Sequence, residues 1–253
     1  SLNNATAKQG FMLGWSFGSA SFATGVSWVY VAMHDFGGTS VALAIPMTAL
    51  FCIGLGLVPA LFAYIYCRWI RDGIAGKTLG FAAMWVLAEW LRGWIFTGFP
   101  WLYLGYGHLH TAMAGWSPVI GVYGLSFWVA LSGAAIAFSI TAPAQLKRHG
   151  YATIAACLAL FALGFSLQNH EWTTADAKPP LRIGAVQSNI SQEKKWAYTQ
   201  YWATLEQYDL ASEELWPDSD LVIWPEAAIP TLYHNALSYF EYIAERAEAN
   251  NSA

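Results

Sequence analysis

The stretch Asp220-Leu221-Val222-Ile223-Trp224-Pro225-Glu226 decides how the C-terminal part of this chain folds. Four apolar residues leave an acidic turn and stop at a proline, a pattern that predicts a short buried strand. Reactive groups of open α/β sheets collect where the strands end, and Glu226 directly follows this strand. We therefore interpret Glu226 as a candidate site residue. The alternative is a surface glutamate that opens the next helix.

Strands and helices alternate around this stretch. Residues 181–187 are predicted to form a strand, 193–215 an amphipathic helix, 220–225 a second strand and 236–249 a second helix. This order predicts a parallel sheet. A parallel sheet must be covered on both faces, so two strands alone indicate that the α/β domain in residues 181–253 is cut short at its C-terminus.

The composition of the whole chain is that of a membrane protein. Of its 253 residues, 56% are hydrophobic and 11% are charged, and the mean hydropathy is +0.36. Average soluble domains carry about 25% charged residues. The net charge is +4 for residues 1–168 and −8 for residues 169–253, which marks a domain boundary. The acidic balance of the second part argues against a nucleic-acid partner, because phosphate binding needs a basic face.

Apolar stretches in residues 1–168 predict a membrane domain of about five helices, since a crossing needs about 20 helical residues. They lie at residues 11–33, 41–67, 79–96, 117–141 and 151–168. A polar linker at residues 169–180 follows the last stretch.

Basic residues occur in every second connection between these stretches. The connections around residues 34–40 and 98–116 contain no lysine or arginine, whereas the basic connections contain Lys8, then Arg68, Arg71 and Lys77, then Lys147 and Arg148. By the positive-inside rule, the basic ends are cytoplasmic. In a bacterium, the acidic domain would then be periplasmic.

The third apolar stretch contains a glutamate and an arginine, Glu89 and Arg92, three residues apart on one helical face. Counted from Lys77 at about 1.5 Å per residue, they lie roughly 18 Å and 22 Å into a core of about 30 Å. Ionisable residues inside a span indicate a functional site. One interpretation is a structural pair of neutralising charges. The other is a headgroup site, in which Arg92 binds a lipid phosphate at the outer interface.

Residues 95–107 are too rich in glycine and proline for a span, and their aromatic side chains favour the outer membrane interface. His108 and His110 alternate after them, but they lack the cysteine or carboxylate neighbours of a metal site. We predict no metal and no cofactor. Cys52, Cys67 and Cys157 lie in or at the end of apolar stretches and are expected to be buried.

Several motifs, in this order along most of the chain, resemble those of bacterial apolipoprotein N-acyltransferases. Each motif alone is weak, but the set is specific. The motifs are Trp28-Val29-Tyr30-Val31 with Gly37-Gly38, Glu89-Trp90-Leu91-Arg92-Gly93-Trp94 with Thr97-Gly98-Phe99-Pro100-Trp101, Val186-Gln187 leading to Lys195-Trp196, and Leu221-Val222-Ile223-Trp224-Pro225-Glu226-Ala227-Ala228-Ile229-Pro230.

This resemblance implies an inner-membrane protein of eight spans with a periplasmic nitrilase-like domain, an α-β-β-α sandwich. The chain resembles the third to seventh spans and the first portion of that domain. The implied reaction transfers an acyl chain from a phospholipid, usually phosphatidylethanolamine, to the N-terminal diacylglyceryl-cysteine of apolipoproteins. It proceeds through a cysteine thioester and a Glu-Lys-Cys triad.

The resemblance also assigns roles to single residues. Glu226 corresponds to the general base of the triad and Trp196 to a tryptophan near the active site. Trp224, two residues before the base, is a candidate substrate-binding residue. A helix-face tryptophan that packs into the core is the alternative for Trp196. The lysine and the cysteine follow Ala253 in the family's order, so we expect the chain alone to be inactive.

Two other classes of function remain open. A membrane-anchored nitrilase-type amidase would share Glu226 but would take water-soluble substrates, whereas Glu89 and Arg92 favour a lipid. A non-enzymatic transporter or scaffold would explain the apolar stretches, but it would not explain a strand that ends in a carboxylate.

Overall fold

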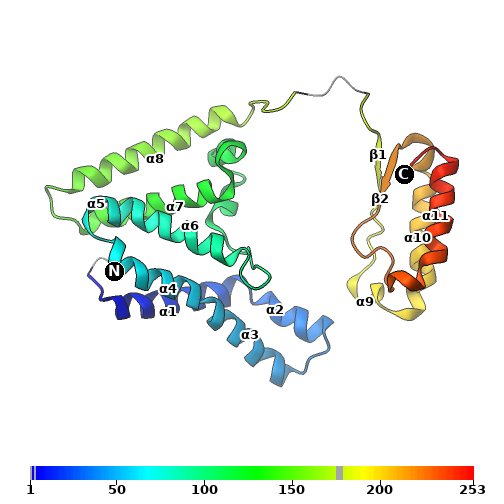
Figure 1. Cartoon of the computed structure of the whole chain (residues 1–253), viewed down its shortest axis with the longest axis horizontal. Helices are drawn as coiled ribbons and strands as arrows, with labels where there is room; N and C mark the ends of the chain where they lie inside the picture. Colours follow the sequence, from blue (N-terminus) through cyan, green and yellow to red (C-terminus); the bar gives the residue numbers. More distant parts are fainter. Residues whose placement is uncertain (1, 3, 175–178) are drawn as a thin grey trace. The chain divides into compact units, whose positions relative to one another are not determined.

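A computed structural model describes residues 2, 4–174 and 179–253. The chain divides into two compact units, Ser1–Thr174 and Ala175–Ala253 (Figure 1). Of the predicted linker, residues 175–178 lie outside the described residues.

All regular secondary structure in the described residues of the first unit is helical. It contains α1 (Ala7–Gly25), α2 (Trp28–Val31), α3 (Val41–Leu55), α4 (Leu57–Ile65), α5 (Gly73–Ala75), α6 (Phe81–Arg92), α7 (Ser117–Thr141) and α8 (Lys147–Leu167). Short π-helical turns at Ala32–Phe36, Tyr66–Ile70 and Gly76–Gly80 extend α2, α4 and α5, and 3-10 turns at Leu104–His108 and Ala112–Trp116 precede α7.

Three helices in the described part of the chain are long and apolar enough to cross a membrane. They are Val41–Ile70, Ala112–Thr141 and Lys147–Leu167, which confirms three of the five predicted stretches. The other two stretches do form helices, but α1 ends at Gly25 and α6 at Arg92. Polar and glycine residues dilute the hydropathy of α1, whereas α6 has only 12 residues and contains Glu89 and Arg92, so length and composition alone do not identify either helix as a span.

Small residues allow α1 and α4 to pack closely. Gly14 and Gly18 are buried on the face of α1 that contacts α4. A Cβ atom on Gly14 would lie 2.7 Å from the carbonyl oxygen of Pro59, so no larger residue fits there without moving a backbone. This contact forms one side of the cavity described below.

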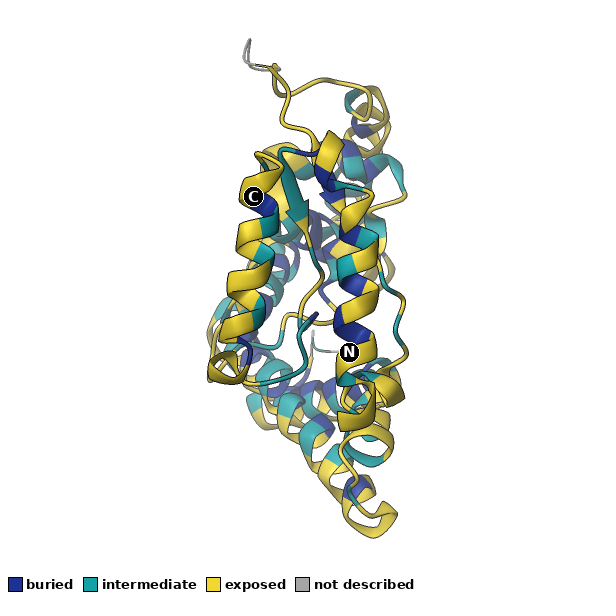
Figure 2. Cartoon of the chain, turned by 90° about the vertical axis from the view of Figure 1, so that its right-hand side faces the viewer, coloured by how far each residue is buried: buried dark blue, intermediate teal, exposed yellow. Residues whose placement is uncertain are grey.

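The second unit contains the predicted parallel strand pair. Strand β1 (Ile183–Ala185) pairs with β2 (Leu221–Ile223), with Gly184 opposite Val222. The helices are α9 (Gln192–Lys195), α10 (Tyr201–Glu213) and α11 (Leu237–Ala249). Exposed positions run along the outer sides of α10 and α11 in Figure 2. Val186, Tyr208 and Ala228 form the buried core between helices and strands.

The single helix predicted at residues 193–215 is wrong. The chain leaves the helix after α9, and Ala197 has extended backbone angles before α10 begins. The end of α9 is held by a contact distant in sequence, in which the Lys195 ammonium group donates a hydrogen bond to the Glu226 carbonyl oxygen at 2.9 Å. Helical periodicity continues on both sides of the break, so the sequence pattern does not reveal it.

Candidate functional site

The membrane unit contains two buried charged side chains on α6. Glu89 is 3% exposed and Arg92 is 6% exposed. Among the described residues, the ion pairs do not include one between them. Each side chain instead binds the backbone of the segment that follows α6, so the two charges do not form a direct ion pair.

Only one of the two oxygen atoms of the Glu89 carboxylate accepts hydrogen bonds. Its Oε1 atom accepts hydrogen bonds from the Trp85 indole N–H and the Leu104 backbone N–H, both at 2.9 Å. Its Oε2 atom is buried and has no hydrogen-bond partner in the described part of the chain. Burial of an unpaired polar atom is costly, so this oxygen points to a missing donor.

Arg92 holds the chain that follows α6. Its Nη1 atom donates to the carbonyl oxygen of Phe99 at 2.7 Å and also to that of Trp101. The guanidinium lies 5.1 Å from the ring centroid of Phe22 and 4.9 Å from that of Tyr103. Cation–π contacts of this kind partly replace the hydration that a buried cation loses.

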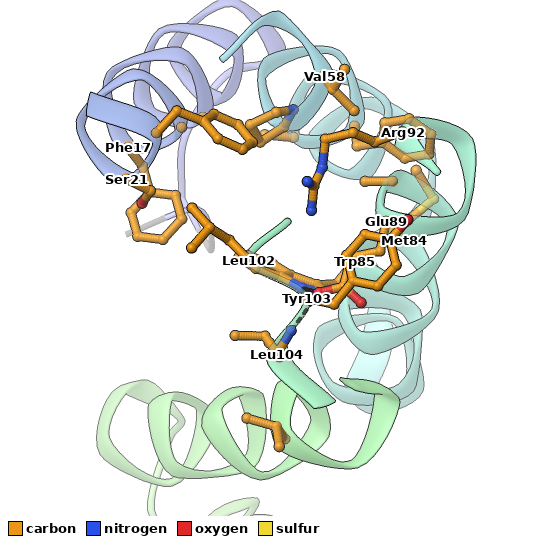
Figure 3. Close-up of a pocket in the computed structure, with 18 of the residues that line it drawn as sticks. Phe17, Ser21, Val58, Met84, Trp85, Glu89, Arg92, Leu102, Tyr103 and Leu104 are labelled. Carbon is orange, nitrogen blue, oxygen red and sulfur yellow. Dashed lines mark hydrogen bonds between the residues drawn. The ribbon is translucent and has the colours of Figure 1, made fainter. Parts of the chain in front are cut away.

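Both charged residues line a cavity of about 1140 Å³. Figure 3 shows the Arg92 guanidinium pointing into the open space, with Leu102 and Tyr103 on the opposite wall. Most of the lining is apolar and comes from α1, α4, α6 and residues 102–108, including Phe17, Phe22, Val58, Phe62, Phe81, Met84 and Trp85. The volume exceeds the roughly 300–1,000 Å³ of ordinary small-molecule pockets, which suits a ligand with long apolar chains.

Residues 102–108, which follow α6 in the sequence, form one wall of this cavity. The Gly105 N–H donates to the Ser126 hydroxyl oxygen on α7 at 2.9 Å, and Ser126 is fully buried. His108, at the end of this segment, also lines the cavity, and its Nδ1 atom is buried without a hydrogen-bond partner among the described residues. His110 is exposed.

Glu226 lies where the sequence pattern places it, in an exposed turn after β2. The following residue, Ala227, has φ of +53°, a conformation that non-glycine residues rarely adopt. Strained backbone of this kind clusters at functional sites. The Lys195 hydrogen bond to the Glu226 carbonyl connects the chain after β1 to this turn. Periodicity and motif spacing do not reveal this role of Lys195, because its partner lies 31 residues away in the sequence.

Trp196 is 61% exposed, in the break between α9 and α10. In this chain, Trp196 does not pack into the core of the second unit. Trp224 is half-buried instead. Its indole N–H donates to the Ser212 hydroxyl at 2.8 Å, and its ring lies 5.2 Å from that of Tyr208. Trp224 therefore stabilises the Glu226 turn by packing on α10.

The three cysteines are free and buried in the first unit, as predicted. Cys67 packs with Tyr66 and Phe62, and Cys157 with Trp128, so these thiols behave as small apolar side chains. Among the described residues, no group of three or more histidine, cysteine or acidic side chains is arranged to hold a metal ion.

Comparison with known proteins places these features in a family. Residues 1–135 match the model of the apolipoprotein N-acyltransferase N-terminal domain. Relatives named apolipoprotein N-acyltransferase include one from Azotobacter vinelandii, 40% identical over 94% of this chain and 46% of the relative. Others come from Pseudomonas aeruginosa (39%, 100% of this chain and 49% of the relative) and Vibrio parahaemolyticus (34%, 100% and 49%). The chain spans about half the length of the curated relatives it matches. By its motifs, its helical membrane unit and these matches, the chain belongs to the apolipoprotein N-acyltransferase family.

Proposed function

We propose that this chain serves in the transfer of an acyl chain from a phospholipid to the N-terminal diacylglyceryl-cysteine of apolipoproteins. The observation that carries the proposal is the similarity to proteins of that name along essentially the whole chain. The position of Glu226 at the carboxyl end of a parallel strand supports it, because reactive groups of such sheets lie there.

In this proposal, residues 181–253 form the first part of a nitrilase-like domain and Glu226 is the general base. It takes the proton from a cysteine thiol, and the thiolate attacks the ester carbonyl of the phospholipid. Collapse of the tetrahedral intermediate breaks the ester C–O bond, Glu226 returns the proton to the leaving oxygen of the lysophospholipid, and a thioester remains. The α-amino group of the apolipoprotein then attacks the thioester, which forms the amide and returns the thiol. Lys195 holds the turn, and the exposed Trp196 contacts substrate.

The nucleophile of this scheme is not one of the three cysteines of the chain. Cys52, Cys67 and Cys157 are buried in the first unit, where a donor ester has no access to them. In the family's order, the lysine and the cysteine of the triad follow the position of Ala253.

The membrane unit would supply the donor lipid. Arg92, buried beside a large apolar cavity, is suited to bind the phosphate of a phospholipid such as phosphatidylethanolamine, with acyl chains along the apolar walls. The proposed location is a bacterial inner membrane, with Glu226 on the periplasmic side. A site closed to water protects a thioester from hydrolysis.

A substitution at the glutamate tests the proposal. In the full-length relative from Azotobacter vinelandii, the position that corresponds to Glu226 is changed to glutamine, which keeps the shape of the side chain but cannot accept the proton. General-base catalysis contributes about 10² to 10⁴ in rate, so formation of the acyl-enzyme from labelled phospholipid should fall by that factor. A rate within threefold of the unchanged enzyme would contradict the assignment. Labelled acyl chain bound covalently to the present chain would also contradict it, since it would show that a buried cysteine reacts.

A further inference from the structure

One end of the second unit presents large apolar side chains to solvent. Tyr198 is 90% exposed, Trp202 72% and Tyr233 71%, and the neighbouring Leu232 and Leu237 are exposed as well. A single exposed apolar side chain needs no explanation, but several at one place mark a contact with another protein or with a membrane. These five residues are called the aromatic end below.

The topology of the unit brings the five side chains together. A helix that connects or follows parallel strands runs back against them, so α10 and α11 both begin at the carboxyl ends of the strands. Tyr198 and Trp202 lie at the start of α10, and Tyr233 lies just before α11. The two helix starts are in contact, because the Tyr239 hydroxyl donates to the Leu205 carbonyl oxygen at 3.1 Å. Figure 1 shows both starts at the end of the unit opposite to the C-terminus.

The aromatic end is separate from the surfaces that further strands would cover. The side of the strand pair that carries Val222 is occupied by both helices, since Val222 packs with Leu215 and shares a cavity with Ile243 of α11. The helices lie on one side of the pair in Figures 1 and 2. Ile183 and Ile223 point to the other side, where they are exposed. A growing parallel sheet needs cover on that open face, and the starts of α10 and α11 are not part of it.

The charges of the unit are distributed unevenly between its two ends. Lys194 and Lys195 precede the aromatic end and balance the nearby acidic residues Glu193 and Glu226. The other end, where α10 and α11 finish, carries six carboxylates and two guanidinium groups, those of Glu213, Glu214, Asp218, Asp220, Glu245 and Glu248 with Arg182 and Arg246. Anionic phospholipid headgroups attract lysines and repel carboxylates. Charge therefore favours contact of a bilayer with the aromatic end.

A bilayer is within reach of this unit. Helix α8 is long and apolar enough to cross a membrane and ends at Leu167, and β1 begins at Ile183. The 15 residues between them, 168–182, span at most about 50 Å when fully extended. A tether of this length gives the second unit a high effective concentration at the bilayer surface. Tryptophan and tyrosine are the side chains that prefer the headgroup region of a membrane.

We propose that the aromatic end is a membrane contact, in which Tyr198, Trp202 and Tyr233 insert into the phospholipid headgroup region. Lys194 and Lys195 lie beside them and face anionic headgroups. The Glu226 turn belongs to the same end of the unit, because Lys195 donates to the Glu226 carbonyl oxygen. The contact therefore holds this turn at the lipid surface. The use of that position in acyl transfer rests on the proposed function, but the contact itself does not.

Fluorescence quenching by labelled lipid tests the contact. The full chain is placed in nanodiscs of phosphatidylethanolamine and phosphatidylglycerol, with one fluorophore attached at Tyr198→Cys. The three native cysteines are buried, and the unchanged chain measures their background labelling. Glu214→Cys, exposed at the other end of α10 and about 20 Å away, is the matched control. A nitroxide on the lipid headgroup should quench the Tyr198→Cys label at least about threefold more than the Glu214→Cys label.

Loss of the other two aromatic side chains tests their role in the contact. Trp202→Ser combined with Tyr233→Ser leaves the core intact, because both side chains are exposed. Quenching of the Tyr198→Cys label should then fall to the level of the control position. Leu210→Ser changes an exposed apolar residue of α10 outside the aromatic end, and it should leave the quenching unchanged.

Equal quenching at the two label positions would overturn the proposal, as would quenching that survives the loss of Trp202 and Tyr233. A Tyr198→Cys label that is shielded from a water-soluble quencher, but is not reached by the lipid nitroxide, would assign this end to a protein partner. That result would also overturn the membrane contact.

Discussion

Replacement of Ser126 by alanine is expected to loosen the cavity wall formed by residues 102–108. The Ser126 hydroxyl accepts a hydrogen bond from the buried Gly105 N–H at 2.9 Å, and the serine itself is 0% exposed. In the alanine variant this N–H has no acceptor and no access to water. A buried donor left unsatisfied costs about 1–3 kcal/mol. Local opening of the wall should therefore become roughly 5- to 150-fold more frequent, since each 1.4 kcal/mol is about tenfold.

Hydrogen–deuterium exchange, measured by mass spectrometry on peptides that cover residues 102–109, reports this opening directly. Ser132→Ala is the matched control on the same helix, because the Ser132 hydroxyl donates only to the Trp128 carbonyl four residues earlier. We expect exchange of the control to stay within twofold of the unchanged chain. Exchange unaltered in Ser126→Ala, or accelerated equally in both variants, would refute the assignment of Ser126 as the anchor of this wall.

Two further predictions concern topology and pH. A reporter that is active only in the periplasm should be active when fused after Ala175 and silent after Arg148, and the opposite pattern would refute the proposed orientation. Hydrogen bonds from Arg182 lower the pKa of Asp220, so their stabilising contribution is present above the usual pKa of about 3.9 and is lost as the pH falls through the lowered value. The thermal unfolding midpoint of Asp220→Asn should lie below that of the unchanged chain at pH 6 and approach it near pH 2, and a constant difference between pH 6 and pH 2 would contradict the linkage.

Much of the architecture could be predicted from the sequence because it depends on local patterns. Long apolar runs identified α3 with α4, α7 and α8, since the length of such a run is set by the thickness of a bilayer. Alternating strand and helix patterns predicted the parallel pairing of β1 with β2. The place of Glu226 followed as well, because a residue after a strand must lie at the edge of the sheet.

Contacts between distant residues could not be predicted in the same way. Spacing on α6 put Glu89 and Arg92 on one face, but only the folded chain decided that Glu89 binds Leu104 and that Arg92 binds Phe99 and Trp101, in place of a bond between the two charges. Each of these partners belongs to a segment without regular periodicity, whose path depends on packing against α1 and α7.

Contacts between distant residues also give Trp196 and Trp224 their different environments. By itself, the sequence determined the composition, the apolar helices and the strand that presents Glu226. The tertiary structure alone decided that Trp196 is exposed at a helix break, that Trp224 is tied to Ser212, and that Lys195 holds the Glu226 turn. Hydropathy and periodicity are properties of neighbouring residues, whereas Trp224 and Lys195 are placed by hydrogen bonds to residues 12 and 31 positions away.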